Sequence, residues 1–113
     1  MLPVENRLLE AKDFELVYRF GGSFSSEDIF LKIRENNLKK TRIGFSIGIK
    51  FSPKAVVRNR IKRQLREIVR KEIKNIKKGY DAVISVKKKT KKEFSSQELK
   101  NSLLEVLKKA KLI

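Results

Sequence analysis

The sequence predicts an α+β fold in which three helices pack against one small sheet. Helical and strand patterns follow one another in the order helix, strands, helix, strand, helix. Strands and helices alternate too few times to build a doubly wound parallel sheet, so a small two-layer sandwich is the expected architecture. The chain has 113 residues, 40% of them apolar, and carries no internal repeat and no long linker. We therefore expect a single domain over residues 1–113 with one modest core.

The first element is a helix over about residues 13–20. Phe14, Val17 and Tyr18 recur at i, i+3 and i+4 spacing, which places them on one face of a helix. Asp13 can cap the start of this helix. The glycine pair that follows can end it, because glycine tolerates the left-handed conformation that is common just after a helix.

Three strands are predicted next, at residues 23–25, 28–34 and 42–50. A polar turn rich in asparagine and lysine separates the second strand from the third. Apolar and polar residues alternate in both of these strands, which is typical of a strand with one buried face. The residues expected to face the core are Ile29, Leu31, Ile33, Ile43, Phe45, Ile47 and Ile49.

The other face of the third strand is unusual because it carries small residues between two cations. Gly44, Ser46 and Gly48 stand between Arg42 and Lys50. Small side chains in a strand often mark a place where a ligand or another backbone approaches closely. Two explanations fit this pattern: the face lies against a ligand, or it is a thin surface covered by a helix.

A long helix is predicted after the third strand. Ser52 and Pro53 are typical of a helix start, with serine as the cap and proline in the first turn. The helix should run towards Lys77, before Gly79 ends it. Its expected apolar stripe consists of Val57, Ile61, Leu65, Ile68 and Ile76, with Val69 and Ile73 beside it.

The C-terminal part is predicted to form a short strand and a last helix. The strand spans residues 80–86, and a basic loop follows at residues 87–92. Ser95 and Glu98 have the spacing of a capping box, which marks the start of the last helix. The apolar stripe of that helix consists of Leu99, Leu103, Val106, Leu107 and Ala110.

The charge of the chain predicts a polyanionic partner. It has 29 basic and 13 acidic residues, a formal net charge of +16, and 20 of the cations lie in residues 51–113. Solubility alone calls for a net charge of only about 2–8. Because the chain has no Cys and no His, a disulfide framework and thiolate or imidazole catalysis are excluded. No segment has the pattern of a membrane span or a secretory signal, and we expect a cytoplasmic protein.

The cations concentrate on one side of the long helix. Residues 54–78 hold eleven basic and two acidic residues, so internal ion pairs cannot balance the charge of a merely solvated face. A membrane-binding helix is a further alternative, but its apolar face is already needed by the core. Guanidinium groups bind phosphate in a planar, bidentate way, and an asparagine can contact a base edge or a sugar hydroxyl. The predicted stripe contains Asn59, Lys62, Arg63, Arg66 and Arg70.

Four segments together resemble the bacterial ribonuclease P protein component family. They are LPVENRL at residues 2–8, DFELVYRFG at 13–21, RIGFSI at 42–47 and RNRIKRQLRE at 58–67, and the YD pair at 80–81 adds a fifth match. The resemblance covers nearly the whole chain. It implies the order αβββαβα, a fold similar to the second domain of a small-subunit ribosomal protein, and a left-handed crossover between parallel strands, against the usual hand.

The resemblance also implies a function and two sets of binding residues. Members assist a catalytic RNA that removes the 5′ leader from precursor tRNA, and Mg²⁺ is expected to be held mainly by the RNA and by no site of the protein alone. The residues implied for binding the catalytic RNA are Arg58, Asn59, Arg60, Lys62, Arg63, Arg66 and Arg70. Those implied for a leader-binding cleft between the sheet and the first helix are Phe14, Tyr18, Phe30, Lys32, Arg42, Ser46, Lys50 and Lys54. Lys32 stands where family members often have an aromatic residue, with Phe30 on the same face.

Within this cleft, the aromatic rings are expected to stack on bases and the cations to neutralise phosphates. No catalytic residue is expected in the protein itself. Two other functions remain open from the residues alone. One is a general RNA-binding or ribosomal protein, and the other is a protein-only nuclease that uses Glu27 and Asp28, although such a pair is more typical of a solvated strand entry.

Overall fold

The computed structural model describes residues 2–87 and 95–113. Apart from Lys87, the predicted basic loop at 87–92 lies outside the described residues. The order of helices and strands agrees with the predicted αβββαβα. The elements are the short 3-10 helix η1 (Val4–Asn6), α1 (Ala11–Phe20), β1 (Gly22–Ser25), β2 (Ile29–Glu35), β3 (Arg42–Phe45), α2 (Ala55–Glu72), the 3-10 helix η2 (Ile73–Asn75), β4 (Tyr80–Val86) and α3 (Ser96–Lys109).

The four strands form one mixed sheet in the order β1-β2-β4-β3. The pairs β1–β2 and β2–β4 are antiparallel, whereas β3 and β4 are parallel and are connected through α2. The outer side of β3 is covered by the N-terminal segment, where the backbone N–H of Leu8 donates to the carbonyl of Ile43 at 3.1 Å. The parallel crossover is therefore present, and its left hand stays a prediction.

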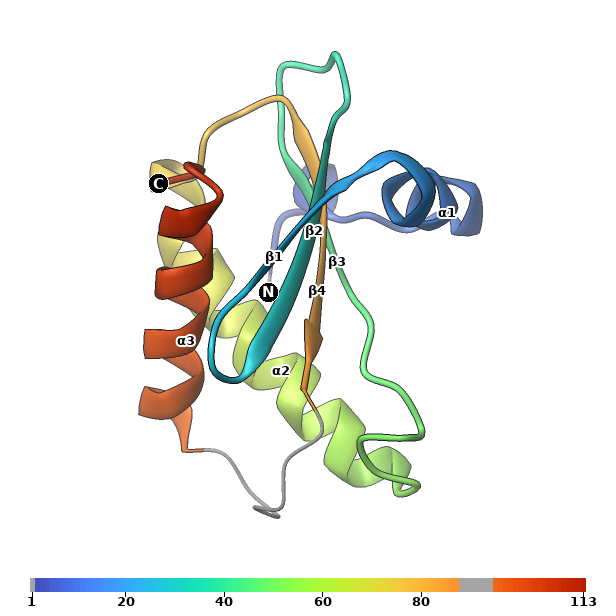
Figure 1. Ribbon diagram of the computed structural model, residues 1–113, viewed down its shortest axis with the longest axis vertical. Coiled ribbons are helices and arrows are strands. Elements are labelled where there is room, and N and C mark those ends of the chain that lie inside the picture. Colours follow the sequence, from blue (N-terminus) through green and yellow to red (C-terminus); the bar gives the residue numbers. More distant parts are fainter. Residues whose placement is uncertain (1, 88–94) are drawn as a thin grey trace.

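The helices lie on both faces of the sheet (Figure 1). α2 and α3 cover one face, and the main core lies between them and the sheet. Its fully buried side chains include Ile29, Leu31, Ile84, Leu65, Val69, Leu99, Leu103 and Leu107. The structure thus adds a partial third layer to the predicted two-layer sandwich, because α1 crosses part of the opposite face of the sheet. A second, smaller cluster of Leu8, Val17 and Val83, with Phe14 packed against it, holds α1 there.

The ends of α1 differ from the prediction. The helix begins at Ala11, with Glu10 at the N-cap position and no side-chain cap, so Asp13 lies inside the helix. Gly21 follows the helix with a φ of −78°, which is an ordinary conformation rather than the left-handed one. What requires glycine at this position is space, because a Cβ atom there would collide with the carbonyl oxygens of Val17 and Ile33.

The third strand is shorter than its alternating sequence predicts. Ladder pairing ends at Phe45, although the N–H of Ser46 still donates to the carbonyl of Ile84 at 2.9 Å. Beyond it the chain bends away from the sheet through a turn in which the N–H of Phe51 donates to the carbonyl of Gly48. Ile47 is buried as expected, but Ile49 is 73% exposed, so its predicted place in the core is wrong.

The C-terminal elements follow the prediction more closely. α2 starts at Ala55 rather than at Ser52 and Pro53, and it passes into η2 after Glu72. β4 has the predicted bounds. Ser95 caps α3 through its side-chain oxygen, which accepts a hydrogen bond from the N–H of Glu98 at 3.1 Å. Among the described residues, the structure has no helix that is long and apolar enough to cross a membrane.

Gly44 explains the small-residue face of β3. The ring of Phe14 lies directly over it, and a Cβ atom added at Gly44 would come within 2.6 Å of Phe14 Cε1 and within 3.2 Å of Leu8 Cβ. Of the two explanations offered for this face, the covering helix is therefore correct at Gly44. The missing side chain lets α1 pack close to the sheet.

We expect Gly44→Ala to lower the free energy of unfolding by about 1–3 kcal/mol, because the added methyl group overpacks the contact with Phe14. Urea denaturation monitored by circular dichroism measures the change. Gly48→Ala is the matched control, since its Cβ atom would meet nothing closer than the backbone nitrogen of Lys50 at 3.9 Å. For the control, stability should be unchanged or raised by less than about 1 kcal/mol. Equal midpoints for the two variants would contradict the packing role of Gly44.

Candidate nucleic-acid interface

The basic side of α2 faces solvent. Ile61, Leu65 and Val69 are buried against the sheet and α3, which turns the opposite side of the helix outward. The side chains of the predicted RNA-binding set divide by exposure. Asn59, Arg60, Arg63, Arg66 and Arg70 are exposed, whereas Arg58 and Lys62 are half-buried. The basic stripe of α2 therefore faces solvent, as the sequence predicts.

Several of these arginines have partners within the protein, among them Arg58, Arg66 and Arg70. Arg58 donates from Nη1 to the carbonyl of Ser52 at 2.8 Å, which ties the preceding loop to α2. The guanidinium carbon of Arg66 lies 6.0 Å from the centroid of the Phe45 ring. Arg70 makes two hydrogen bonds to Glu67, at 2.6 and 3.0 Å. These bonds lower the pKa of the Glu67 carboxyl group and raise the pKa of Arg70.

Acidic side chains on α2 do not neutralise the rest of the stripe. Glu67 is occupied by Arg70, and Glu72 accepts a hydrogen bond from Asn75 at 3.3 Å. Within residues 2–87 and 95–113, Lys62, Arg63 and Arg66 form no ion pair with a carboxylate. The exposed side of α2 therefore presents cations whose charge is available to an anionic partner.

A shallow hollow lies between α1 and the open part of the sheet. Its volume is about 180 Å³, and its lining includes Tyr18 from α1, Phe30 and Lys32 from β2, and Ser85 from β4. Lys32 donates from Nζ to the carbonyl of Tyr18 at 3.2 Å, and the same Nζ lies 5.8 Å from the centroid of the Tyr18 ring. Three of the predicted cleft residues thus converge, as aromatic rings next to a cation.

Lys87 belongs to this surface although the sequence analysis did not single it out. Its Nζ lies 5.0 Å from the centroid of the Phe30 ring. The alternation of β4 could have identified it, because Lys87 is two residues beyond Ser85 and so falls on the same side of the sheet. It was missed because it was counted with the basic loop.

The remaining cleft residues are more dispersed. Ser46 is half-buried just after β3, and Lys50 and Lys54 are exposed in the loop that leads to α2. Phe14 is half-buried and does not line the hollow with Tyr18; it lies over Gly44 at the other end of α1. Its first role is therefore to anchor the helix, and its stacking on a leader base stays a prediction.

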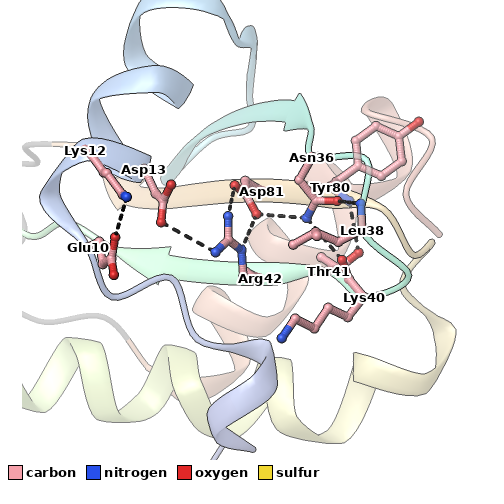
Figure 2. A network of polar contacts seen from close by, with 10 residues as sticks. All are labelled: Glu10, Lys12, Asp13, Asn36, Leu38, Lys40, Thr41, Arg42, Tyr80 and Asp81. Atoms are coloured by element: carbon pink, nitrogen blue, oxygen red, sulfur yellow. Dashed lines mark hydrogen bonds and ion pairs between the residues drawn. The ribbon is translucent and has the colours of Figure 1, made fainter.

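Arg42 has a structural role that the sequence analysis did not predict. Its Nε and Nη2 donate to the two carboxylate oxygens of Asp81 at 2.8 and 2.7 Å, and its Nη1 lies 3.4 Å from Oδ2 of Asp13 (Figure 2). The bonds to Asp81 raise the pKa of Arg42, so the guanidinium stays charged. Three of its five N–H donors point to these carboxylates, so Arg42 acts as an anchor inside the fold, and its contact with leader phosphates stays a prediction. The sequence could not reveal this, because the partners lie 29 and 39 residues away.

The Arg42 network continues to the turn that precedes β3 (Figure 2). Asn36 donates from Nδ2 to Oδ1 of Asp81 at 2.9 Å, and its own Oδ1 accepts from the N–H of Leu38 at 2.8 Å. The hydroxyl group of Thr41 donates to the carbonyl of Lys77 at 2.6 Å. These contacts fix the ends of the parallel strands and, through Asp13, the start of α1.

Glu27 and Asp28, the acidic pair that a protein-only nuclease would use, differ in their exposure to solvent. Glu27 is exposed, whereas Asp28 is buried and its backbone N–H donates to Ser102 Oγ at 3.0 Å. In the part of the chain that the structure describes, no three acidic side chains come together as a metal site.

Comparisons with known proteins agree with this architecture. A family model described as Ribonuclease P matches residues 2–111. The ribonuclease P protein component of Finegoldia magna is 41% identical over 104 residues, which cover 92% of this chain and 89% of that protein. The protein of the same description from Pseudanabaena sp. is 40% identical, with 100% of this chain and 97% of the relative covered.

Solved structures show the same fold. The RNase P protein of Staphylococcus aureus superposes with a TM-score of 0.85 at 29% identity, over 95% of this chain and 96% of that one. The Thermotoga maritima RNase P protein, solved in complex with 1-(4-fluorophenyl)-2-thiourea, gives a TM-score of 0.83 at 35% identity, over 90% of this chain and 97% of that one.

We expect Asp81→Asn to destabilise the protein by about 3 kcal/mol, because it leaves the half-buried Arg42 without its main counter-charge. Chemical denaturation at neutral pH measures the loss. Glu15→Gln is the control, since it breaks an exposed pair with Arg19 and should cost no more than about 0.5 kcal/mol. A similar small effect of both substitutions would show that the Arg42 network is not a structural anchor.

Proposed function

Because the chain belongs to the ribonuclease P protein component family, we propose that it binds the catalytic RNA through α2 and the precursor tRNA leader through the cleft beside α1. The family implies a role in the 5′ processing of tRNA by an endoribonuclease. The single observation that carries the finer proposal is the basic stripe of α2, in which the exposed Arg63 and Arg66 have no carboxylate partner among the described residues. In this role the protein works in the cytoplasm, and it screens charge and positions the substrate.

The composition of α2 supports a folded RNA as its partner. Arg63 and Arg66 stand on its solvent side without a carboxylate partner in the described chain, and Asn59 lies near the start of the same stripe. Guanidinium groups suit phosphates, and the asparagine amide can both donate to and accept from a sugar or a base edge. α2 contains no aromatic residue, so base stacking on the helix itself is not part of this interface.

The cleft is suited to an unpaired strand rather than a duplex. Tyr18 and Phe30 are both partly exposed, and each ring has an ammonium group nearby, from Lys32 and Lys87 respectively. A single-stranded leader supplies what these groups bind, because its bases can stack on the rings while its phosphates take the lysines. Ser46, Lys50 and Lys54 extend this surface towards α2.

We assign phosphodiester hydrolysis, and the Mg²⁺ that it needs, to the RNA. The chain has no His and no Cys, and Glu27 and Asp28 differ in exposure in a way that does not suit a shared metal. The contribution of the protein to catalysis is then to hold the leader in place and to reduce repulsion between two RNAs.

Reconstitution with a bacterial ribonuclease P RNA tests this function. At low Mg²⁺, the purified protein should increase the rate of leader cleavage, because its cations replace part of the screening that Mg²⁺ otherwise provides. No increase would reject the proposal. Similar affinity for unrelated structured RNAs would favour a general RNA-binding protein, and cleavage by the protein alone that is lost in Glu27→Gln would favour a protein nuclease.

For the α2 interface, we expect Arg63→Ala to weaken binding to the catalytic RNA roughly tenfold, since a charge-assisted hydrogen bond contributes on the order of 1.5 kcal/mol. The slope of log affinity against log salt should fall by about 1. Filter binding across a salt series measures both quantities. Lys39→Ala, in the exposed turn before β3, removes the same charge and should leave the affinity within about twofold. Equal losses in both variants would mean that only net charge matters.

For the cleft, we expect Tyr18→Ala to weaken binding of precursor tRNA by at least about fivefold, the lower end of what one stacked base contributes. Affinity for mature tRNA, which has no leader, should not change. Phe20→Ala is the matched control, because Phe20 is an aromatic residue of the same helix, is 67% exposed and does not line the hollow. A leader effect that is as large for Phe20 as for Tyr18 would contradict the cleft assignment. Titration of the holoenzyme with both tRNA forms provides the measurement.

A further inference from the structure

A second cavity, separate from the hollow, lies where the N-terminal segment, Phe14 of α1, β3 and α2 meet. Its volume is about 260 Å³. Phe14, Leu8 and Phe45 supply apolar walls, and Arg66 and Arg7 supply the charge. This volume is below the roughly 300–1,000 Å³ of sites for drug-sized ligands, so the cavity suits one small planar group.

The charged side chains are held at the cavity by contacts within the protein. Arg7 donates from Nε to the carbonyl of Leu2 at 2.8 Å, which fixes its side chain against the N-terminal segment. Arg66 lies with its guanidinium carbon 6.0 Å from the centroid of the Phe45 ring. Arg66 also belongs to the exposed stripe of α2. The cavity is therefore continuous with the surface that we propose for the catalytic RNA.

We propose that this cavity binds a single unpaired nucleobase of the structured RNA that docks on α2. The inference rests on the proposed function and adds a base-binding subsite to it. An aromatic wall beside a guanidinium group is the combination that holds splayed-out RNA bases by stacking. The positive charge at the cavity complements the phosphate of the same nucleotide. A protein side chain would use the apolar walls but would leave both arginines without an anion.

The exposed Leu9 allows the site to be tested without disturbing the core. Leu9 lines the cavity and is 67% exposed, so a polar substitution there removes no buried contact. Leu38, in the turn before β3, is also an exposed leucine and does not line the cavity. Leu9→Glu and Leu38→Glu change the net charge of the protein equally. Their difference therefore reports on the cavity and not on overall electrostatics.

The experiment is a titration of the isotope-labelled full chain with adenosine 5′-monophosphate, followed by NMR. The backbone amide signals of Gly44 and Leu8 report on the cavity, and that of Ser85 reports on the separate hollow beside α1. We expect saturable shifts at Gly44 and Leu8, with an affinity at least tenfold higher than for ribose 5-phosphate or for phenol. In Leu9→Glu the affinity read at Gly44 should fall at least fivefold, and in Leu38→Glu it should change less than twofold.

Several outcomes would overturn the inference. Equal binding of ribose 5-phosphate would reduce the cavity to a phosphate site, and equal binding of phenol would make it a pocket for a protein side chain. Shifts confined to Ser85 would place the nucleotide only in the leader cleft. Because the titration contains no catalytic RNA, its failure is distinct from a failure of the reconstitution assay.

Discussion

The contact between the ring of Phe14 and the backbone of Gly44 is the constraint on which the functional surfaces depend. It lets α1 lie across the face of the sheet that α2 and α3 leave uncovered, and the pair between Asp13 and Arg42 holds the start of the helix in the same place. α1 packs mainly over β2 and β4, and the sheet surface beside Tyr18, lined by Phe30 and Ser85, stays open. The hollow with Tyr18 and Phe30 and the cavity beside Arg66 both include a side chain of this helix in their walls.

Several acidic groups of the protein are paired with cations away from the solvent side of α2. Asp81 and Asp13 form ion pairs with Arg42 inside the fold, where an unpaired guanidinium group would destabilise the protein. Several of the others make short-range pairs on their own helices, such as Glu15 with Arg19 and Glu67 with Arg70. Few acids are then left for the solvent side of α2. A net charge of +16 therefore becomes a directed surface rather than a uniform one.

The two proposed RNA surfaces differ in chemistry for a physical reason. On α2 the helix presents flexible guanidinium groups around an arc, which suits the regularly spaced phosphates of a folded RNA. Beside α1, the Tyr18 ring of that helix and the Phe30 ring of the sheet each have a lysine next to them, which suits bases that are not paired. Arg66 combines features of both surfaces, because it belongs to the basic stripe of α2 and also lies next to the aromatic ring of Phe45. In the proposed function, one short chain thus binds a structured partner and a single-stranded segment through different surfaces.

Local pattern was sufficient for the order of the elements, the outward stripe of α2, the bounds of β4 and the Ser95 cap, because each depends on residues within a few positions of one another. It was not sufficient wherever a distant residue takes part. Whether Gly44 faced a ligand or a helix depended on Phe14, 30 residues earlier in the chain, and the role of Arg42 depended on Asp81, 39 residues later. Ile49 lies outside the core because the pairing of β3 with β4 ends before it, although the alternation of apolar and polar residues continues to this position. Periodicity records which side chains share a face, whereas only the packed chain decides what that face meets.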